Sequence, residues 1–102
     1  MDTLYDLQHL RFEWDAEKAS ANLVKHGVDF FDAAEVFLDP LAIAGDASGD
    51  DGEGREWLLG ETYRLRLLIV VHTERGDRAR IISARPATRH ERRTYEGFDG
   101  GR

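Results

Sequence analysis

The residues best suited to chemistry in this chain are arginines, and they gather in one part of it. Residues 62–93 contain nine Arg and no Lys against three acidic residues, whereas residues 1–61 contain four cations against fifteen Asp and Glu. The net charge of −6 averages over this segregation. Because a guanidinium group donates paired hydrogen bonds to phosphate oxygens, the basic segment is a candidate phosphate-binding surface. The alternative is a set of solvated strand and helix faces that pair with the acidic half.

Three other residues are candidates for proton transfer or phosphate binding. His26 carries an imidazole and is a candidate general acid or base; its alternative role is to stabilise a helix end as a cation. Lys25 shares the polar face of the same predicted helix with Lys18 and Asn22, and is either a phosphate ligand or a solvated lysine. Glu53 is a candidate base if it faces the arginines; otherwise it is one more carboxylate in an acidic loop.

The sequence gives little support for metal or disulfide chemistry. It has no cysteine, which excludes disulfides and thiolate metal sites, and its four histidines show no close ligand spacing. The acidic stretch that begins at Asp46 is similar to a calcium loop, but Asp51 stands where that loop needs Gly and Trp57 where it needs Glu. We therefore expect no metal site and no cofactor.

Local patterns predict three helices and about five strands. Asp15 can cap a helix that Gly27 ends in the left-handed conformation, and Thr88 with Glu91 forms a capping box. The apolar run at residues 67–71 indicates a central strand. Helices are expected at 16–26, 29–38 and 88–97, and strands at 11–14, 41–44, 55–61, 64–73 and 78–85. The order strand, helix, helix, four strands, helix predicts an α+β fold with a small antiparallel sheet packed against helices.

The strand assignments decide which arginines share a face of the sheet. Arg66 and Arg80 lie on paired strands, and Arg85 ends the second of these strands. Strict alternation places Arg78, Arg80 and Ala84 on one face and Arg85 on the other, unless a bulge near Pro86 re-aims it. Arg85 and Arg80 are therefore not expected to form one cluster without such a bulge.

Two further groups of residues have assigned places. Arg89 and Arg92 lie on the last helix, where they bind phosphate or a partner, or form salt bridges on a solvated helix surface. Trp14 and Trp57 are expected in the core, and His72 in the central strand as a hydrogen-bonded core histidine.

Length and hydropathy indicate one domain away from membranes. A chain of 102 residues fits a single domain, and its longest apolar run is too short to span a bilayer. The N-terminus lacks the basic and apolar regions of a signal peptide, so the expected location is the cytoplasm. We expect an N-terminal extension at residues 1–10, a folded domain at 11–97 and a frayed tail at 98–102.

A series of sequence blocks resembles the BrnT family of type II toxins. The blocks occur in the same order and together cover nearly the whole chain, from about residue 11 to 96. They are FEWD at residues 12–15, KHGV at 25–28, EVFLDP at 35–40, GEGRE at 52–56, Gly60, RLLIVVHT at 66–73, RGD at 75–77, RIISAR at 80–85, ATR at 87–89 and ERRTYE at 91–96.

The resemblance implies a RelE-like fold and a ribonuclease that cleaves RNA without a metal, which arrests translation and growth. It also implies neutralisation by a BrnA-like antitoxin that binds promoter DNA, so that this chain reaches DNA only through the antitoxin. The implied substrate is mRNA, free or on the ribosome. Two features depart from the family pattern: residues 1–10 extend beyond it, and Pro86 stands where the family commonly has a basic residue.

Metal-free cleavage of RNA by its own 2′-hydroxyl needs a base, an acid and cations that stabilise the extra charge on phosphorus. Arg85 is the first candidate because it ends the family-like Ser-Ala-Arg block. The alternatives are a non-catalytic module that binds RNA, the ribosome or an antitoxin, and a divalent-metal hydrolase. The candidate catalytic residues are Lys25, His26, Glu53, Arg66, Arg80 and Arg85, and the candidate RNA-binding residues are Arg78, Arg89 and Arg92.

Overall fold

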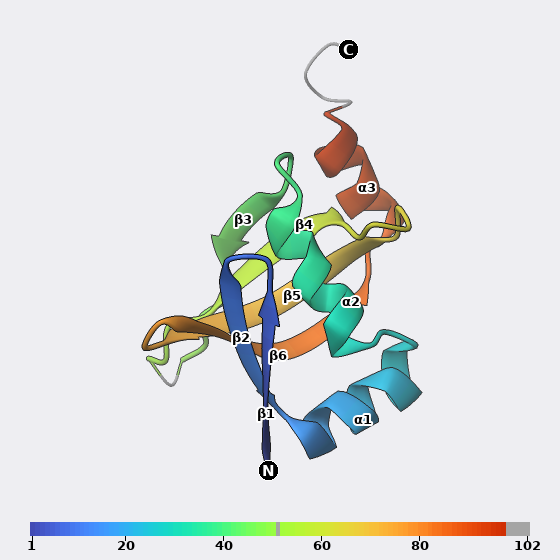
Figure 1. The fold of residues 1–102 in the computed structure, drawn as a ribbon. Helices are drawn as coiled ribbons and strands as arrows, with labels where there is room; N and C mark the ends of the chain where they lie inside the picture. The colour runs from blue at the N-terminus through green and yellow to red at the C-terminus, as the bar shows by residue number, and fades with distance from the viewer. Residues whose placement is uncertain (51, 98–102) are drawn as a thin grey trace.

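Six strands form one sheet in the computed structural model, which describes residues 1–50 and 52–97 (Figure 1). The strand order is β1-β2-β6-β5-β4-β3. The strands are β1 (Asp2–Leu7), β2 (Leu10–Asp15), β3 (Ile43–Asp46), β4 (Glu56–Glu61), β5 (Leu67–Arg75) and β6 (Arg78–Pro86). The helices are α1 (Ala16–His26), α2 (Phe30–Glu35), the short 3-10 helix η1 (Val36–Leu38) and α3 (Arg89–Glu96). Within the described ranges, no helix has the length and apolar character needed to cross a membrane.

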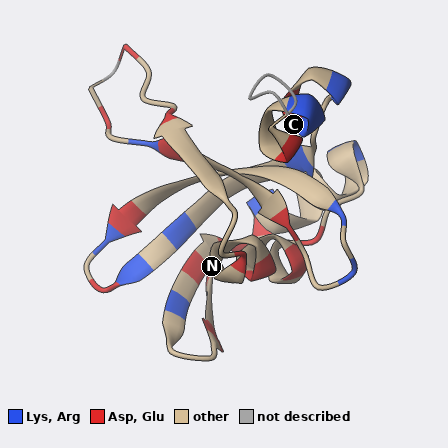
Figure 2. Cartoon of the chain, turned by 90° about the horizontal axis from the view of Figure 1, so that it is seen from above, with Lys and Arg blue, Asp and Glu red and all other residues tan. Residues whose placement is uncertain are grey.

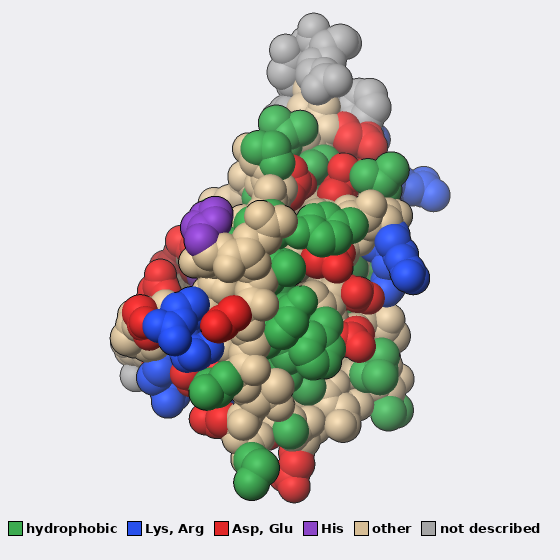
Figure 3. Space-filling model, in the orientation of Figure 1, with side chains coloured by type: hydrophobic (Ala, Val, Ile, Leu, Met, Phe, Trp, Pro, Cys, Tyr) green, Lys and Arg blue, Asp and Glu red, His purple; other side chains and the backbone are tan. Residues whose placement is uncertain are grey.

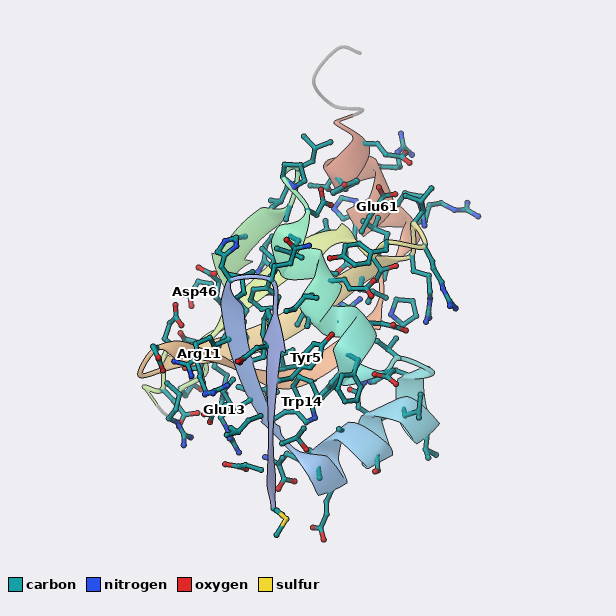
Figure 4. The ribbon with its side chains drawn as sticks, viewed as in Figure 1. Tyr5, Arg11, Glu13, Trp14, Asp46 and Glu61 are labelled. Carbon is teal, nitrogen blue, oxygen red and sulfur yellow. The ribbon has the colours of Figure 1, made fainter. Side chains whose placement is uncertain are left out.

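The predicted α+β class is confirmed, but the sheet has six strands rather than about five. The additional strand, β1, pairs with β2 in antiparallel register along its whole length. Its main contact with the core is Tyr5, whose ring centroid lies 5.8 Å from that of Trp14 and 4.9 Å from that of Phe31 (Figure 4). An alternating strand with so few apolar side chains carries a weak hydrophobic signal, which explains why the sequence patterns did not predict it.

The prediction of a purely antiparallel sheet is wrong because β2 pairs with β6 in parallel. This contact is short: Phe12 lies opposite Ala79 and Glu13 opposite Arg80. The two helices and the strands β3, β4 and β5 separate β2 from β6 in the chain. Since no turn joins the two strands, local sequence holds no signal for their pairing or its direction.

The predicted helix ends are confirmed by their caps. The Asp15 side chain accepts a hydrogen bond from the Lys18 backbone at 3.0 Å, and Gly27 adopts the left-handed conformation with φ +68°. Thr88 and Glu91 form the expected capping box at the start of α3. The predicted helix at 29–38 is divided, because the α-helix ends at Glu35 and continues as the 3-10 helix η1. The predicted frayed tail at 98–102 lies outside the described residues.

The two faces of the sheet are covered to different extents. Leu68 and Val70 of β5 point into the main core with Phe30 and Val36 of the α2–η1 segment. Their neighbours, Leu67 and Ile69, point to the opposite face and form a smaller cluster with Leu59 and Tyr95. This second face is covered by α3 at one end, and the remainder is open enough to form a cavity.

A β-bulge in β6 decides which of its side chains reach that second face. Val71 of β5 pairs with Ser83 and His72 pairs with Ile81, so Ile82 is left without a partner. As a result Ile81 and Ala84, three residues apart, both point into the main core. The predicted alternation is therefore wrong beyond the bulge, which lies at Ile82 and not near Pro86. Arg85 shares a face with Arg80, and Ala84 lies on the other.

The buried side chain of Asn22 attaches α1 to the edge of β6. Asn22 was expected on a polar face, yet it is 7% exposed. Its amide Nδ2 donates to the carbonyl of Ala84 at 2.8 Å and of Val28 at 3.0 Å, and its Oδ1 accepts from the Ala84 backbone N–H at 3.1 Å. Since β2 pairs with β6 only as far as Arg80, Asn22 takes the place of a strand partner at Ala84.

We predict that Asn22→Ala lowers the free energy of unfolding by about 2–4 kcal/mol, because it leaves buried backbone groups of Ala84 without partners. Urea unfolding measures the loss. Val24→Ala is the matched control on the same helix: Val24 is 88% exposed, and its replacement is expected to change stability by less than about 0.5 kcal/mol. Equal stability of the two variants would contradict the assigned role of Asn22.

Candidate functional site

A cavity of about 800 Å³ opens on the sheet face opposite α2. Leu59 of β4 and Ile69 and Val71 of β5 line its floor. The C-terminal end of α1 lines one part of its wall and α3 lines another. Because α1, β6 and α3 are far apart in the chain, the cavity brings together side chains that no local motif connects.

Three of the predicted catalytic residues line this cavity. Lys25 and His26 come from the last turn of α1, and Arg85 comes from the end of β6. The backbone carbonyls at a helix C-terminus favour nearby cations, so the position of Lys25 and His26 also stabilises the helix. Arg66 is close to the same helix end, where its Nη1 donates to the carbonyl of Gly27 at 3.2 Å, but it does not line the cavity.

Arg85 forms a bidentate ion pair with Glu91 of α3. Its Nη1 and Nη2 donate to the two carboxylate oxygens at 2.8 and 2.9 Å, and Nη1 also donates to the carbonyl of Pro86 at 3.2 Å. The hydrogen bonds from Arg85 lower the pKa of Glu91 to about 2, assisted by the backbone N–H of Thr88. These bonds use three of the five guanidinium N–H groups, so the remaining two are available to an anionic ligand.

Sequence reasoning missed three further residues of the cavity lining. Trp57 was expected in the core, but it is only partly buried and lines the cavity. Ser83 reaches the cavity because of the bulge, and His90 because α3 forms part of the wall. The signal that could have identified Trp57 is Gly45, its partner on the neighbouring strand, which leaves room for the indole.

Two predicted arginines lie in a separate ion-pair cluster. Lys and Arg positions are spread over strands, loops and α3 (Figure 2). Arg80 donates to Asp2 at 3.1 Å and to Glu13 at 2.7 Å. Arg78 donates to Asp6 at 3.3 Å and to a β2 carbonyl at 2.8 Å. Figure 4 shows Glu13 on β2 at the end of the sheet away from α3. The carboxylates of β1 and β2 therefore partner these arginines away from the cavity.

The remaining predicted residues also lie outside the cavity lining. Glu53 sits in the loop between β3 and β4, with its Oε1 3.0 Å from Nη2 of Arg55. Arg92 lies 3.8 Å from Glu96 on the surface of α3, and Arg89 is exposed at the first position of that helix. Of the predicted catalytic and RNA-binding residues, the cavity lining therefore includes Lys25, His26 and Arg85.

His72 is buried as expected, but it is not the hydrogen-bonded core histidine that the sequence suggested. Its Nε2 lies 3.3 Å from Glu56 Oε1, and neither ring nitrogen makes a hydrogen bond with the described residues. Its ring packs edge-on against Phe37, with centroids 4.8 Å apart. Burial lowers the pKa of His72, and the ring lies on the α2 side of the sheet, away from the cavity.

The cavity lining combines positively charged side chains with imidazoles. Lys25 and Arg85 are the cations, and guanidinium and ammonium groups are side chains that suit phosphate oxygens. His26 and His90 are the imidazoles, a side chain that can act as general acid or base. Within the described residues, no group of His, Asp and Glu is arranged to hold a metal ion.

Comparisons with known proteins agree on one family. Residues 14–91 match the sequence model of the ribonuclease toxin BrnT of type II toxin–antitoxin systems. The 1.1 Å crystal structure of the Brucella abortus ribonuclease toxin BrnT is similar to this structure with a TM-score of 0.61 and 32% sequence identity. The match covers 74% of this chain and 94% of that chain. The comparison with curated proteins gave no match.

We predict that the ion pair between Glu91 and Arg85 makes stability depend on acidic pH. The folded-state pKa of Glu91 is about 2 against an ordinary 4.5, so the stabilisation is complete above pH 4.5 and is lost as the pH falls towards 2. Glu91→Gln keeps an acceptor for the capping box but removes the charge. Because the pair is partly exposed, we expect the variant to be about 1 kcal/mol less stable at pH 7.

Urea unfolding of both proteins between pH 2 and pH 7 measures this dependence. The difference between wild type and Glu91→Gln should shrink below pH 4.5 and vanish near pH 2. A difference that stays constant over this range would mean that charge on Glu91 contributes nothing to folding.

Proposed function

The chain belongs to the BrnT family of type II toxin–antitoxin ribonuclease toxins, and from this premise we propose that it cleaves RNA in the cavity between α1, β6 and α3. The proposed cleavage uses no metal ion. One observation carries the proposal. Lys25 and His26 of α1 and Arg85 of β6, about sixty residues apart in the chain, line the same cavity. Convergence of two cations and an imidazole is what charge stabilisation and proton transfer at a phosphodiester require.

In the proposed reaction the 2′-hydroxyl of the RNA attacks its own phosphorus. One imidazole takes the 2′ proton as the O2′–P bond forms, and the other, protonated, gives a proton to the 5′ oxygen as the P–O5′ bond breaks. His26 and His90 are the two imidazoles that line the cavity. Lys25 and Arg85 stabilise the additional negative charge on the phosphorane. The products are a 2′,3′-cyclic phosphate and a 5′-hydroxyl.

Arg85 meets the phosphate while it is paired with Glu91. The phosphate oxygens compete with Glu91, or bind the two guanidinium N–H groups that Glu91 and Pro86 leave available. An alternative function, a module that binds RNA, the ribosome or an antitoxin without cleaving, is favoured by the same contact, because Glu91 already neutralises Arg85. The experiment below separates the two functions.

The antitoxin partner follows from membership of a type II toxin–antitoxin family. We propose that it is BrnA-like and that this chain reaches DNA only through it, in the cytoplasm. The face over α2 presents acidic and hydrophobic side chains, with Lys and Arg at its margins (Figure 3). Charge complementarity on that face favours a partner with a basic surface.

We predict that the wild-type chain cleaves single-stranded RNA in the presence of EDTA and leaves 2′,3′-cyclic phosphate ends. Arg85→Ala and Lys25→Ala should each lower the cleavage rate by about 100-fold or more, because each removes charge stabilisation from the transition state. Lys18→Ala is the matched control: it removes the same charge from an exposed position of the same helix, outside the cavity, and should leave the rate unchanged.

Gel analysis of a labelled RNA with mass spectrometry of the ends measures these outcomes, and circular dichroism checks that each variant is folded. Loss of cleavage in EDTA would indicate a divalent-metal hydrolase instead. RNA binding without cleavage under any condition would indicate the non-catalytic module.

A further inference from the structure

The indole of Trp57 is held against the backbone of the neighbouring strand. Trp57 of β4 lies opposite Gly45 of β3, and a Cβ atom added at Gly45 would overlap the indole atoms Cζ2, Cε2 and Nε1. Only glycine therefore allows the ring to lie over this position. The ring is supported by β3, is only partly buried and lines the cavity. The indole is therefore held in place by the strand beneath it and is still accessible from the cavity.

The surroundings of the indole suit a flat ligand with apolar faces and polar edges. Leu59, Ile69 and Val71 continue the apolar floor beside Trp57. Ser83 lines the same cavity and brings a hydroxyl group to it. The cavity volume of about 800 Å³ falls in the range of about 300–1,000 Å³ that is typical of small-molecule sites. A nucleobase can stack on such a floor and use the hydroxyl at its edge.

The charges in the cavity point to the same ligand. Lys25 and Arg85 line the cavity together with Trp57, so an anionic group bound by these cations lies next to the apolar floor. A purely apolar peptide would offer no anion to Lys25 or to Arg85. A nucleotide satisfies both parts of the site, with its phosphate at the cations and its base on the floor. In a duplex the bases are already paired and stacked, so the occupant must be single-stranded.

We propose that Trp57 is the stacking platform for an unpaired nucleobase of the RNA, next to the phosphate that Lys25 and Arg85 bind. The inference rests on the proposed ribonuclease function and adds to it a base-binding subsite and a preference for single strands. Trp57 takes no part in proton transfer here; it binds substrate and positions the neighbouring phosphodiester.

Binding of two matched oligonucleotides tests the platform in the full chain. One is a hexamer of 2′-O-methyl adenosine, which lacks the attacking hydroxyl and is not cleaved, and the other has the same backbone and phosphates without bases. We expect the wild type to bind the base-bearing hexamer about tenfold more tightly than the base-free one. Trp57→Leu should lose this preference and bind both hexamers equally, whereas Trp57→Phe, which keeps an aromatic ring, should retain most of it.

Tryptophan fluorescence supplies a second measurement. The chain has two tryptophans, and Trp14 is 2% exposed in the main core, on the opposite face of the sheet from the cavity. Stacking of a base on Trp57 should quench part of the emission in the wild type, and Trp57→Phe should show no quenching while it still binds. Thermal unfolding checks that Trp57→Leu is folded, and Trp57→Phe keeps the test decisive if it is not.

Equal binding of the two hexamers by the wild type, with cleavage of RNA intact, would overturn this inference alone. A base preference that survives in Trp57→Leu would also overturn it. If the wild type neither binds the hexamers nor cleaves RNA, the proposed function fails, and the stacking site fails with it. Lys25→Ala and Arg85→Ala should weaken both hexamers equally, which separates the phosphate contacts from the base contact.

Discussion

The arrangement of the cavity depends on the side chain of Asn22, which replaces a missing strand partner at the edge of β6. β2 stays beside β6 for two register pairs only, which exposes the edge of β6 at Ala84. Asn22 satisfies both backbone groups of Ala84 and so fixes the helix that carries Lys25 and His26. The bulge at Ile82 turns Ala84 towards the core and Arg85 towards the cavity. Together these two features place the end of α1 and the end of β6 around one cavity.

The second constraint is electrostatic. The chain carries a net charge of −6, and its carboxylates partner many of its arginines. Arg78 and Arg80 are bound by Asp2, Asp6 and Glu13, so they contribute to the stability of the β1–β2–β6 edge. The cavity keeps positive charge because Lys25 is exposed at a helix end and because Glu91 is the one carboxylate that pairs with Arg85 among the described residues. A phosphate group therefore suits this site better than a neutral group, because it competes with Glu91 or binds the N–H groups of Arg85 that Glu91 leaves available.

The sequence predicted the features that depend on residues close to one another in the chain. Asp15, Gly27 and the capping box at Thr88 are short-range signals, and the helices whose ends they mark are confirmed. The strand β1, the parallel contact of β2 with β6 and the bulge at Ile82 depend on residues distant in the chain, and none has a local pattern. The same distinction between local and distant signals applies to the residues of the candidate site. Lys25, His26 and Arg85 lie in family-like blocks, whereas Trp57 enters the cavity only because Gly45 lies beneath it.

Backbone amide chemical shifts provide the most direct test of the claim that the end of α1 and the end of β6 form one RNA site. A ¹⁵N-labelled chain is titrated with an RNA analogue that lacks free 2′-hydroxyls and is not cleaved. The account predicts that the largest shift changes occur together at Lys25, His26 and Arg85, and that they saturate with one common dissociation constant. Changes confined to Arg78 and Arg80, with the end of α1 unaffected, would contradict it.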